Sequence, residues 1–415
     1  MRGYRAWIFL LVLGIVVGLV AWSVQLRGGL IFTNLRNSFA WGLYIAMFVF
    51  LFGIAVGGLI ILSSIYLFEL VSLKPLAKIS TIIAFASAVG AGVMIFPDLG
   101  RPERAINMLL KPNFSSPLVW DLVVISATVL LLLLYLYVQA LPNLVRRKSR
   151  LVFLVKGKSD REAEVLSART LKALSLIAFP AAILILAADA WIFATQMSRP
   201  WWHSAVMAPD FIAVAIASAA VSVILVSLIV SRGRSLKRDS AAFSTLVKIA
   251  AAAIPIHFFF MYNDFLLRWW WNAPHELEPL VITLRHYTRL HLAELILPLA
   301  AFAMLLYPRL KASYRGLISA CLILLIGVFA HRYLLLPSAY NYIPLSLTVP
   351  GGHGAPGKLW PYPISLGAYN PPSDTFVTFW NYLPSITELL VAVLPLALVL
   401  LIITLGRRFY LINKT

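Results

Sequence analysis

Residues 41–71 decide the fold, and they read WGLYIAMFVFLFGIAVGGLIILSSIYLFELV, with Glu69 as the one charged side chain. About 20 apolar residues are enough to cross the hydrocarbon core of a bilayer as an α-helix. The run exceeds that length, so it predicts a membrane-spanning helix that tilts or projects. Gly53, Gly57 and Gly58 within it permit another helix to approach closely in lipid.

Other apolar runs of sufficient length lie on both sides of this one. The composition agrees with many spans, because 61% of the 415 residues are apolar and 12% are charged, against about 45–50% and about 25% in soluble chains. We therefore expect an all-α polytopic membrane protein, a single membrane domain over 1–415 with two four-helix bundles and flanking helices. The predicted spans are 6–25, 41–71, 76–97, 119–141, 171–193, 209–231, 246–268, 287–307, 316–336 and 384–405.

The basic residues predict the orientation of these spans. The first span follows Arg2 and Arg5 as a signal peptide would, but its apolar core is long and no A-x-A site follows, so we expect it to be retained. Roughly two thirds of the 35 Lys and Arg residues fall at the termini and in the even-numbered connections. Both termini are therefore predicted to be cytoplasmic. Most of the acidic residues lie on the other side, so the net charge of +19 reflects topology and gives no reason to expect nucleic-acid binding.

Cysteine use limits the redox chemistry that the chain can perform alone. Cys321 is the one cysteine, which excludes disulfides, CxxC pairs, four-cysteine iron–sulfur sites and covalent CxxCH haem attachment. The histidines of the outer loops lack ligand spacing, so we predict no metal site. Electrons must pass through a bound organic molecule, a non-covalent haem or a partner protein.

Ionisable side chains gather near the predicted outer ends of the spans, where burial in lipid would be costly. Contact with interfacial water or pairing with an arginine explains the presence of any one such side chain. A cluster of them, by contrast, indicates function. The group consists of Asp98, Asp121, Asp189, Asp210, Asp264, Arg289, His291, Glu294, His331, Arg332 and Glu388.

The most informative segment joins the third and fourth spans. It reads FPDLGRPER over residues 96–104 and NFSSPLVWD over residues 113–121. Asp98 ends one predicted helix and Asp121 begins the next, so the two carboxyl groups can lie close together. A carboxylate near Arg101 and Trp120 suits proton exchange with a quinol hydroxyl. A tight helix hairpin held by ion pairs is the structural alternative.

These two motifs, D-L-G-R-P-x-R and S-P-x-x-W-D, resemble the NrfD/polysulfide-reductase family of integral membrane subunits. The aromatic and glycine-rich residues 41–58 resemble its first core helix, and residues 171–405 match mainly in helix number, as in the ten-span members. The resemblance implies a quinone-reactive subunit in the cell membrane that uses a menaquinone- or ubiquinone-like quinone. It also implies an iron–sulfur (ferredoxin-like) partner on the outer face, serving a molybdopterin enzyme, a hydrogenase or a cytochrome.

The resemblance assigns roles to residues of the matched segment. Asp98 stands where the family has its quinone-site acid, and Arg101 and Asp121, which lie in the same motifs, are expected to tune it. Some members carry His and Asn on the first core helix to bind a quinone carbonyl. This chain has Trp41 and Tyr44 there, so Tyr44 is the candidate carbonyl partner. Trp41, Tyr44 and Trp120 are expected to line the ring site.

A second polar series lies on the predicted spans seven and eight. His257 and Asp264 share a helix face at i, i+7, and His291 and Glu294 share one at i, i+3. Together with Arg289 they predict either a proton relay or a buried polar network that holds the helices in register. His291 and His331 lie at matching depth for a haem b, but no further pattern supports haem.

The sequence thus predicts a quinone-reactive membrane anchor of a respiratory oxidoreductase, with its functional face extracytoplasmic and proton translocation as a possible addition. We assign the quinone site to the bundle over 41–193, a second bundle to 209–336, and partner docking to the outer loop 337–383. A proton-coupled secondary transporter and a purely structural anchor remain the alternatives. The chain is not expected to be catalytic alone.

Overall fold

The computed structural model describes residues 2–36, 39–146, 159–196, 198–272, 274–340, 362–363, 376–377 and 382–411. Within these residues, 10 helices are long and apolar enough to cross a membrane, and each predicted span coincides with one of them. The all-α polytopic fold is therefore confirmed. The long helices are α1 (Arg2–Gly28), α2 (Leu43–Leu67), α3 (Ala77–Asp98), α5 (Pro117–Arg146), α6 (Asp160–Ala194), α7 (Met207–Ser231), α9 (Ser240–Trp271), α11 (Thr288–Leu306), α13 (Tyr314–Leu334) and α15 (Ile386–Leu411).

Short elements connect these helices. β1 (Tyr362–Pro363) and β2 (Phe376–Val377) form a small antiparallel pair inside the loop predicted to dock a partner. Apart from residues 337–340, 382–383 and this pair, that loop lies outside the described residues. The short helices are η1 (Leu30–Phe32), η2 (Val71–Leu76), η3 (Pro102–Ala105), α4 (Ile106–Leu110), η4 (Pro200–Trp202), α8 (Arg234–Arg238), α10 (Pro274–His286), α12 (Pro308–Lys311) and α14 (Pro337–Tyr340).

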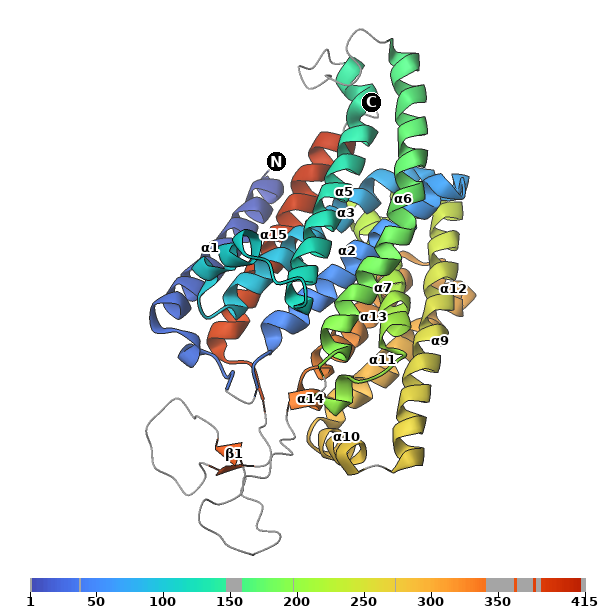
Figure 1. Ribbon diagram of the computed structural model, residues 1–415. Coiled ribbons are helices and arrows are strands. Elements are labelled where there is room, and N and C mark those ends of the chain that lie inside the picture. Colours follow the sequence, from blue (N-terminus) through green and yellow to red (C-terminus); the bar gives the residue numbers. More distant parts are fainter. Residues whose placement is uncertain are drawn as a thin grey trace, which may run out of the picture.

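The long helices form two groups of four with a flanking pair, in agreement with the predicted arrangement (Figure 1). Helices α2, α3, α5 and α6 make the first group, and α7, α9, α11 and α13 make the second. Helix α7 packs on α2 and α6 and so joins the groups, while α1 and α15 pack on each other and α15 packs on α3. Helix α1 begins and α15 ends on the same side of the molecule. We call the opposite end, where α3 ends and α2 begins, the outer end, following the distribution of basic residues.

Helix α2 is the centre of the molecule. In the most apolar 18-residue stretch of α2, 94% of the residues are buried, whereas in the corresponding stretch of α1 17% are buried. A Cβ atom added at Gly57 would lie 2.1 Å from the carbonyl oxygen of Ala215 on α7, and one at Gly58 would lie 2.9 Å from Ala84 Cβ on α3. The close helix approach predicted from these glycines is confirmed.

The inner end of α2 is shorter than predicted. The helix ends at Leu67 rather than 71, because Glu69 adopts a left-handed φ of 54° and the amides of Phe68 and Leu70 bond back to the last turn. The Glu69 carboxylate then pairs with Lys172 at 2.5 Å, with both side chains largely exposed. This acid therefore belongs to a surface ion pair.

A buried hydrogen-bonded group ties the C-terminal end of the long outer loop to the start of α2. The Tyr382 hydroxyl donates to Glu388 and accepts from the amide of Leu43 at 2.8 Å. The other oxygen of Glu388 accepts from the amides of Asn34 and Ser385, each at 2.9 Å. Glu388, one of the predicted outer-end acids, is fully buried and its carboxylate accepts these three bonds, so it stabilises the junction of α1, α2 and α15.

Candidate functional site

Asp98 is the last residue of α3 and lies at the outer end. Its Oδ1 atom is buried and has no hydrogen-bond partner within the described part of the chain. Beside it, Gln25 of α1 donates to the carbonyl of Pro97 at 2.6 Å and accepts from the Tyr44 hydroxyl at 2.6 Å. Glu388 is close enough to act electrostatically on both Asp98 and Tyr44. The structure thus places Tyr44 near Asp98, with Gln25 bonded to Tyr44 and to the residue before Asp98.

Trp41 lies in an aromatic cluster at the same end. Its ring stacks on Trp202 with centroids 5.6 Å apart and meets the edges of Phe193 and Tyr340 at 5.7 and 6.3 Å. The Nε1 atom of Trp202 donates to the carbonyl of Leu335 at 2.7 Å. Protein rings therefore cover Trp41 on several sides, and its clearest role is to pack the start of α2 against α6, η4 and α14.

Two residues of the matched motif do not join Asp98. Arg101 is exposed, and its side chain makes no hydrogen bond or ion pair to any residue that the structure describes. Trp120 is 50% exposed and donates to the carbonyl of Phe114 at 2.8 Å. Within the described residues, neither side chain bonds to Asp98. The predicted tuning of Asp98 by Arg101 and the predicted ring contact of Trp120 therefore stay predictions.

Asp121 belongs to a different polar group from Asp98. It is buried on α5, and the neighbouring charge that acts on it is Asp189 of α6 rather than Asp98. Asp189 is fully buried, and neither of its oxygens is hydrogen-bonded to the described residues. Arg332 of α13 lies within electrostatic range of Asp189, and its guanidinium sits 3.8 Å from the centre of the Phe211 ring.

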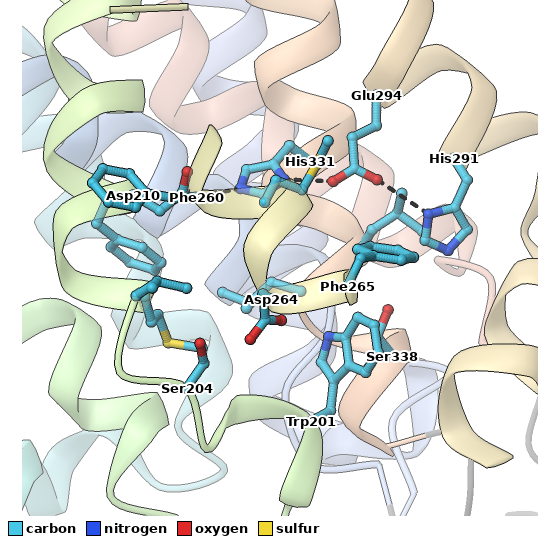
Figure 2. A pocket seen from close by; sticks show the side chains of 16 residues that line it. Trp201, Ser204, Asp210, Phe260, Asp264, Phe265, His291, Glu294, His331 and Ser338 are labelled. Carbon is cyan, nitrogen blue, oxygen red and sulfur yellow. Dashed lines mark hydrogen bonds and ion pairs between the residues drawn. The ribbon is translucent and has the colours of Figure 1, made fainter. Parts of the chain in front are cut away.

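A continuous hydrogen-bonded network joins the helices of the second group near their outer ends. Figure 2 shows the part that runs from Asp210 through His331 and Glu294 to His291. Asp210 of α7 contacts His257 Nδ1 at 2.5 Å and His331 Nε2 at 3.2 Å. The other nitrogen of His331 lies 2.5 Å from Glu294, whose second oxygen is 3.1 Å from His291 Nδ1. All five side chains are largely buried, and we call them the His–carboxylate network.

The network contains three of the five predicted relay residues: His257, His291 and Glu294. Asp264 instead bonds Arg268 one turn along α9 at 3.0 Å, and Arg289 is exposed without a partner in the described ranges. Asp210 and His331 complete the network, although the sequence marks them as outer-end ionisable residues, and His331 as a haem candidate, without placing either in the relay. No spacing rule could link them, because they lie on helices far apart in the chain. His291 and His331, the two histidines considered for haem, both contact Glu294.

A pocket opens beside this network, with about 640 Å³ of empty space, part of it open to the surroundings. Asp210, Glu294, His291 and His331 form its main polar wall, Ser204, Asp264 and Ser338 add further polar groups, and aromatic and aliphatic side chains form the rest. Figure 2 shows Trp201 and Ser204 on the side away from His331 and Glu294. Within the described residues, Asp210, His257 and His331 also offer ligand atoms within 4.8 Å of one another, as a bound cation would need. The direct contact of 2.5 Å between His257 and Asp210 is a hydrogen bond, however.

Comparison with known proteins agrees with the resemblance seen in the motifs. A family model described as "Polysulphide reductase, NrfD" matches residues 32–344. The chain is 36% identical over 254 residues to a putative membrane subunit of the dimethyl sulfoxide reductase of Halobacterium salinarum, covering 61% of this chain and 58% of that protein. It is 22% identical over 278 residues to a selenate reductase subunit of Mesobacillus selenatarsenatis, covering 63% and 64%. The chain therefore spans less than two thirds of the length of either relative.

Proposed function

Because the chain belongs to the NrfD polysulphide reductase family, we propose that it is the quinone-reactive membrane subunit of a respiratory reductase complex. In this proposal it exchanges electrons between the membrane quinone pool and an iron–sulfur subunit docked on the outer face. Two relatives are named as subunits of reductases, which favours a reductase as the catalytic partner. The loop 337–383, outside the described residues for most of its length, is the proposed docking segment.

The buried, unpaired oxygen of Asp98 carries this proposal. A buried polar atom without a partner costs free energy, so such atoms are rare unless a ligand or water satisfies them. Asp98 Oδ1 lies at the outer end next to the hydrogen-bonded pair Tyr44 and Gln25. The residues present therefore fit a ligand that brings a hydroxyl group to this carboxyl.

The chain's own residues would hold and move the proton, while the bound quinone supplies the two-electron chemistry. Asp98 would accept the proton of the hydroxyl. Gly100 and Arg101, which follow it, are exposed and give that proton a short route to water. Tyr44 already donates its hydroxyl hydrogen to Gln25, so as a carbonyl partner it would have to exchange this bond for one to the ligand.

A second role, proton transfer across part of the membrane, is favoured by the His–carboxylate network. His331 lies between two carboxylates, and a neutral imidazole has only one N–H to donate. Both contacts are hydrogen bonds only if the group carries an additional proton, on His331 or on one carboxyl. We therefore propose that this network, with Asp210 and His331 in place of Asp264 and Arg289, is the relay.

Turnover of the purified reductase complex with a quinol tests the proposal. Asp98→Asn keeps the shape of the side chain but removes its basicity, and should lower quinol-linked turnover by roughly 100-fold or more, the usual contribution of a positioned acid or base. Activity of the catalytic subunit with an artificial electron donor should not change. Glu103→Gln, an exposed acid in the same connection, is the matched control.

Each contrary outcome points to one of the alternatives. Near-normal quinol turnover in Asp98→Asn would leave the structural anchor, in which the chain only holds the enzyme at the membrane. Proton-driven solute uptake into vesicles containing this chain alone would indicate the transporter. Loss of both quinol and artificial-donor activity would show that the substitution damages assembly. In that case Asp98→Glu, which keeps the carboxyl, must restore turnover for the assignment to stand.

A further inference from the structure

We propose that the pocket beside the His–carboxylate network is a second binding site for a quinone-class headgroup, separate from Asp98. The ligand class rests on the proposed function, but the site rests on contacts of its own. We call it the α9–α11 pocket, since residues of α9 and α11 form two of its walls.

The pocket has the lining of a small-molecule site. Apolar walls with a few convergent polar groups are the usual composition of such sites. Flat aromatic and flexible thioether side chains suit a planar ring, because both offer broad and polarisable contact surfaces. These lining residues are Trp201, Met207, Phe211, Phe260, Met261 and Phe265.

Two buried polar atoms that line the pocket have no partner in the described residues: His291 Nε2 and Ser338 Oγ. His291 is more than nine-tenths buried, and Ser338 is almost completely so. They come from α11 and α14, which are separate in the chain. A ligand with oxygen substituents would satisfy both atoms.

The hydrogen bonds of the network decide which ligand chemistry fits. His291 Nδ1 faces Glu294, which as a carboxylate only accepts, so the proton of a neutral His291 is on Nδ1. Its Nε2 is then an acceptor and suits a ligand hydroxyl. Ser338 can donate to a carbonyl or accept from a hydroxyl. A ring that carries hydroxyl or carbonyl oxygens, the headgroup of a quinol or quinone, matches this pair.

The exposed faces of α9 and α11 fit the same ligand. On α9, Phe259 and Tyr262 are exposed beside the pocket residues Phe260 and Met261. On α11, Leu292 is exposed between His291 and Glu294 in the sequence, and Leu295 and Ile296 follow on the same exposed side. The two helices that form these walls thus also have apolar, exposed faces, as lipid contact requires, which suits a lipid-soluble ligand.

Binding stoichiometry tests the proposal on the full-length protein in detergent. Tryptophan fluorescence is titrated with a hydroxyquinoline N-oxide, a quinol analogue, and Trp201 in the pocket wall serves as an internal reporter. We expect two sites per chain. His291→Phe keeps a ring of similar size, Ser338→Ala removes only the hydroxyl, and each should weaken one site roughly tenfold, as the loss of one hydrogen bond would. Leu292→Ala, on the exposed face of α11, should leave both sites unchanged.

The outcomes separate this site from that at Asp98. Two sites in the wild type, one weakened by Ser338→Ala and the other by Asp98→Asn, support both assignments. One site that responds only to Asp98→Asn overturns the α9–α11 pocket and leaves the proposed function standing. One site that responds only to the pocket variants supports the pocket and overturns Asp98. The absence of saturable quenching overturns both. Ser338→Ala is a small change, so it remains informative if His291→Phe fails to fold.

Discussion

Replacing Gly57 with alanine should destabilise the protein strongly, although the substitution adds a single methyl group. The new Cβ would lie 2.1 Å from the backbone oxygen of Ala215 and 2.5 Å from its carbonyl carbon. A backbone atom of α7 cannot rotate away as a side chain can. Helix α7 must therefore shift by roughly 1 Å, and this shift would open the contact that joins the two helix groups.

The magnitude follows from two opposing effects. Overpacking a well-packed contact usually costs about 1–3 kcal/mol, and a clash with backbone belongs at the upper end of that range. Alanine recovers about 1 kcal/mol, because glycine is the poorer helix former. The net loss is about 2 kcal/mol. Gly53 is the matched control on the same helix, since its nearest neighbour would be 3.9 Å away, so Gly53→Ala should gain about 1 kcal/mol.

The two variants are compared by unfolding in mixed micelles with increasing denaturing detergent, with thermal melting as a second measurement. The free energies of unfolding should differ by about 3 kcal/mol, with Gly53→Ala the more stable. Equal stabilities would refute the reasoning, because the two substitutions differ only in the distance to α7. The same refutation would follow if both variants were destabilised.

Three further measurements address other parts of the structure. Tyr382→Phe removes the hydroxyl that bonds both Glu388 and the start of α2, and should cost about 1–3 kcal/mol by detergent unfolding; an unchanged midpoint would contradict this role. Asp210→Asn breaks a buried group of charges and should cost roughly 3–5 kcal/mol, whereas wild-type stability would mean that its histidine neighbours are uncharged and find other partners. The hydrogen bond from Lys172 lowers the pKa of Glu69, so any stabilisation by this pair is present at neutral pH and lost as the pH falls through that lowered value. Both side chains are exposed, so Glu69→Gln should match the wild type in melting temperature at pH 7 and below, and a clear loss at pH 7 would show a larger role.

The spans could be predicted from the sequence because each one depends on its own residues. A helix in lipid must be apolar along its whole length and satisfies its backbone hydrogen bonds internally, so a run such as 384–405 predicts α15 without knowledge of any neighbour. The close approach of other helices to α2 could likewise be predicted from Gly57 and Gly58 in the sequence. The end of α2 was predicted too far along the chain, because Val71 and its neighbours are apolar although the helix stops at Leu67.

The candidate sites were predicted only in part. Asp98 was matched through a motif and Tyr44 was chosen in place of the family's missing His and Asn; both lie at the outer end, where Gln25 bonds Tyr44 and the carbonyl of Pro97. Asp121 was expected beside Asp98, but it faces Asp189 on α6. The adjacency of two residues at a helix hairpin is a sequence property, whereas the direction in which each side chain points depends on the rotation of its helix.

The sequence by itself determined that the chain is a ten-span helical membrane protein whose ionisable residues gather at one end, because hydrophobic length and charge placement are properties of single segments. The tertiary structure alone decided which of those residues meet. His331 joins Asp210 to Glu294 only because α13 packs against both α7 and α11, helices far apart in the chain. Helix rotation and helix contacts are set by close packing of all the helices together, and no local pattern carries that information.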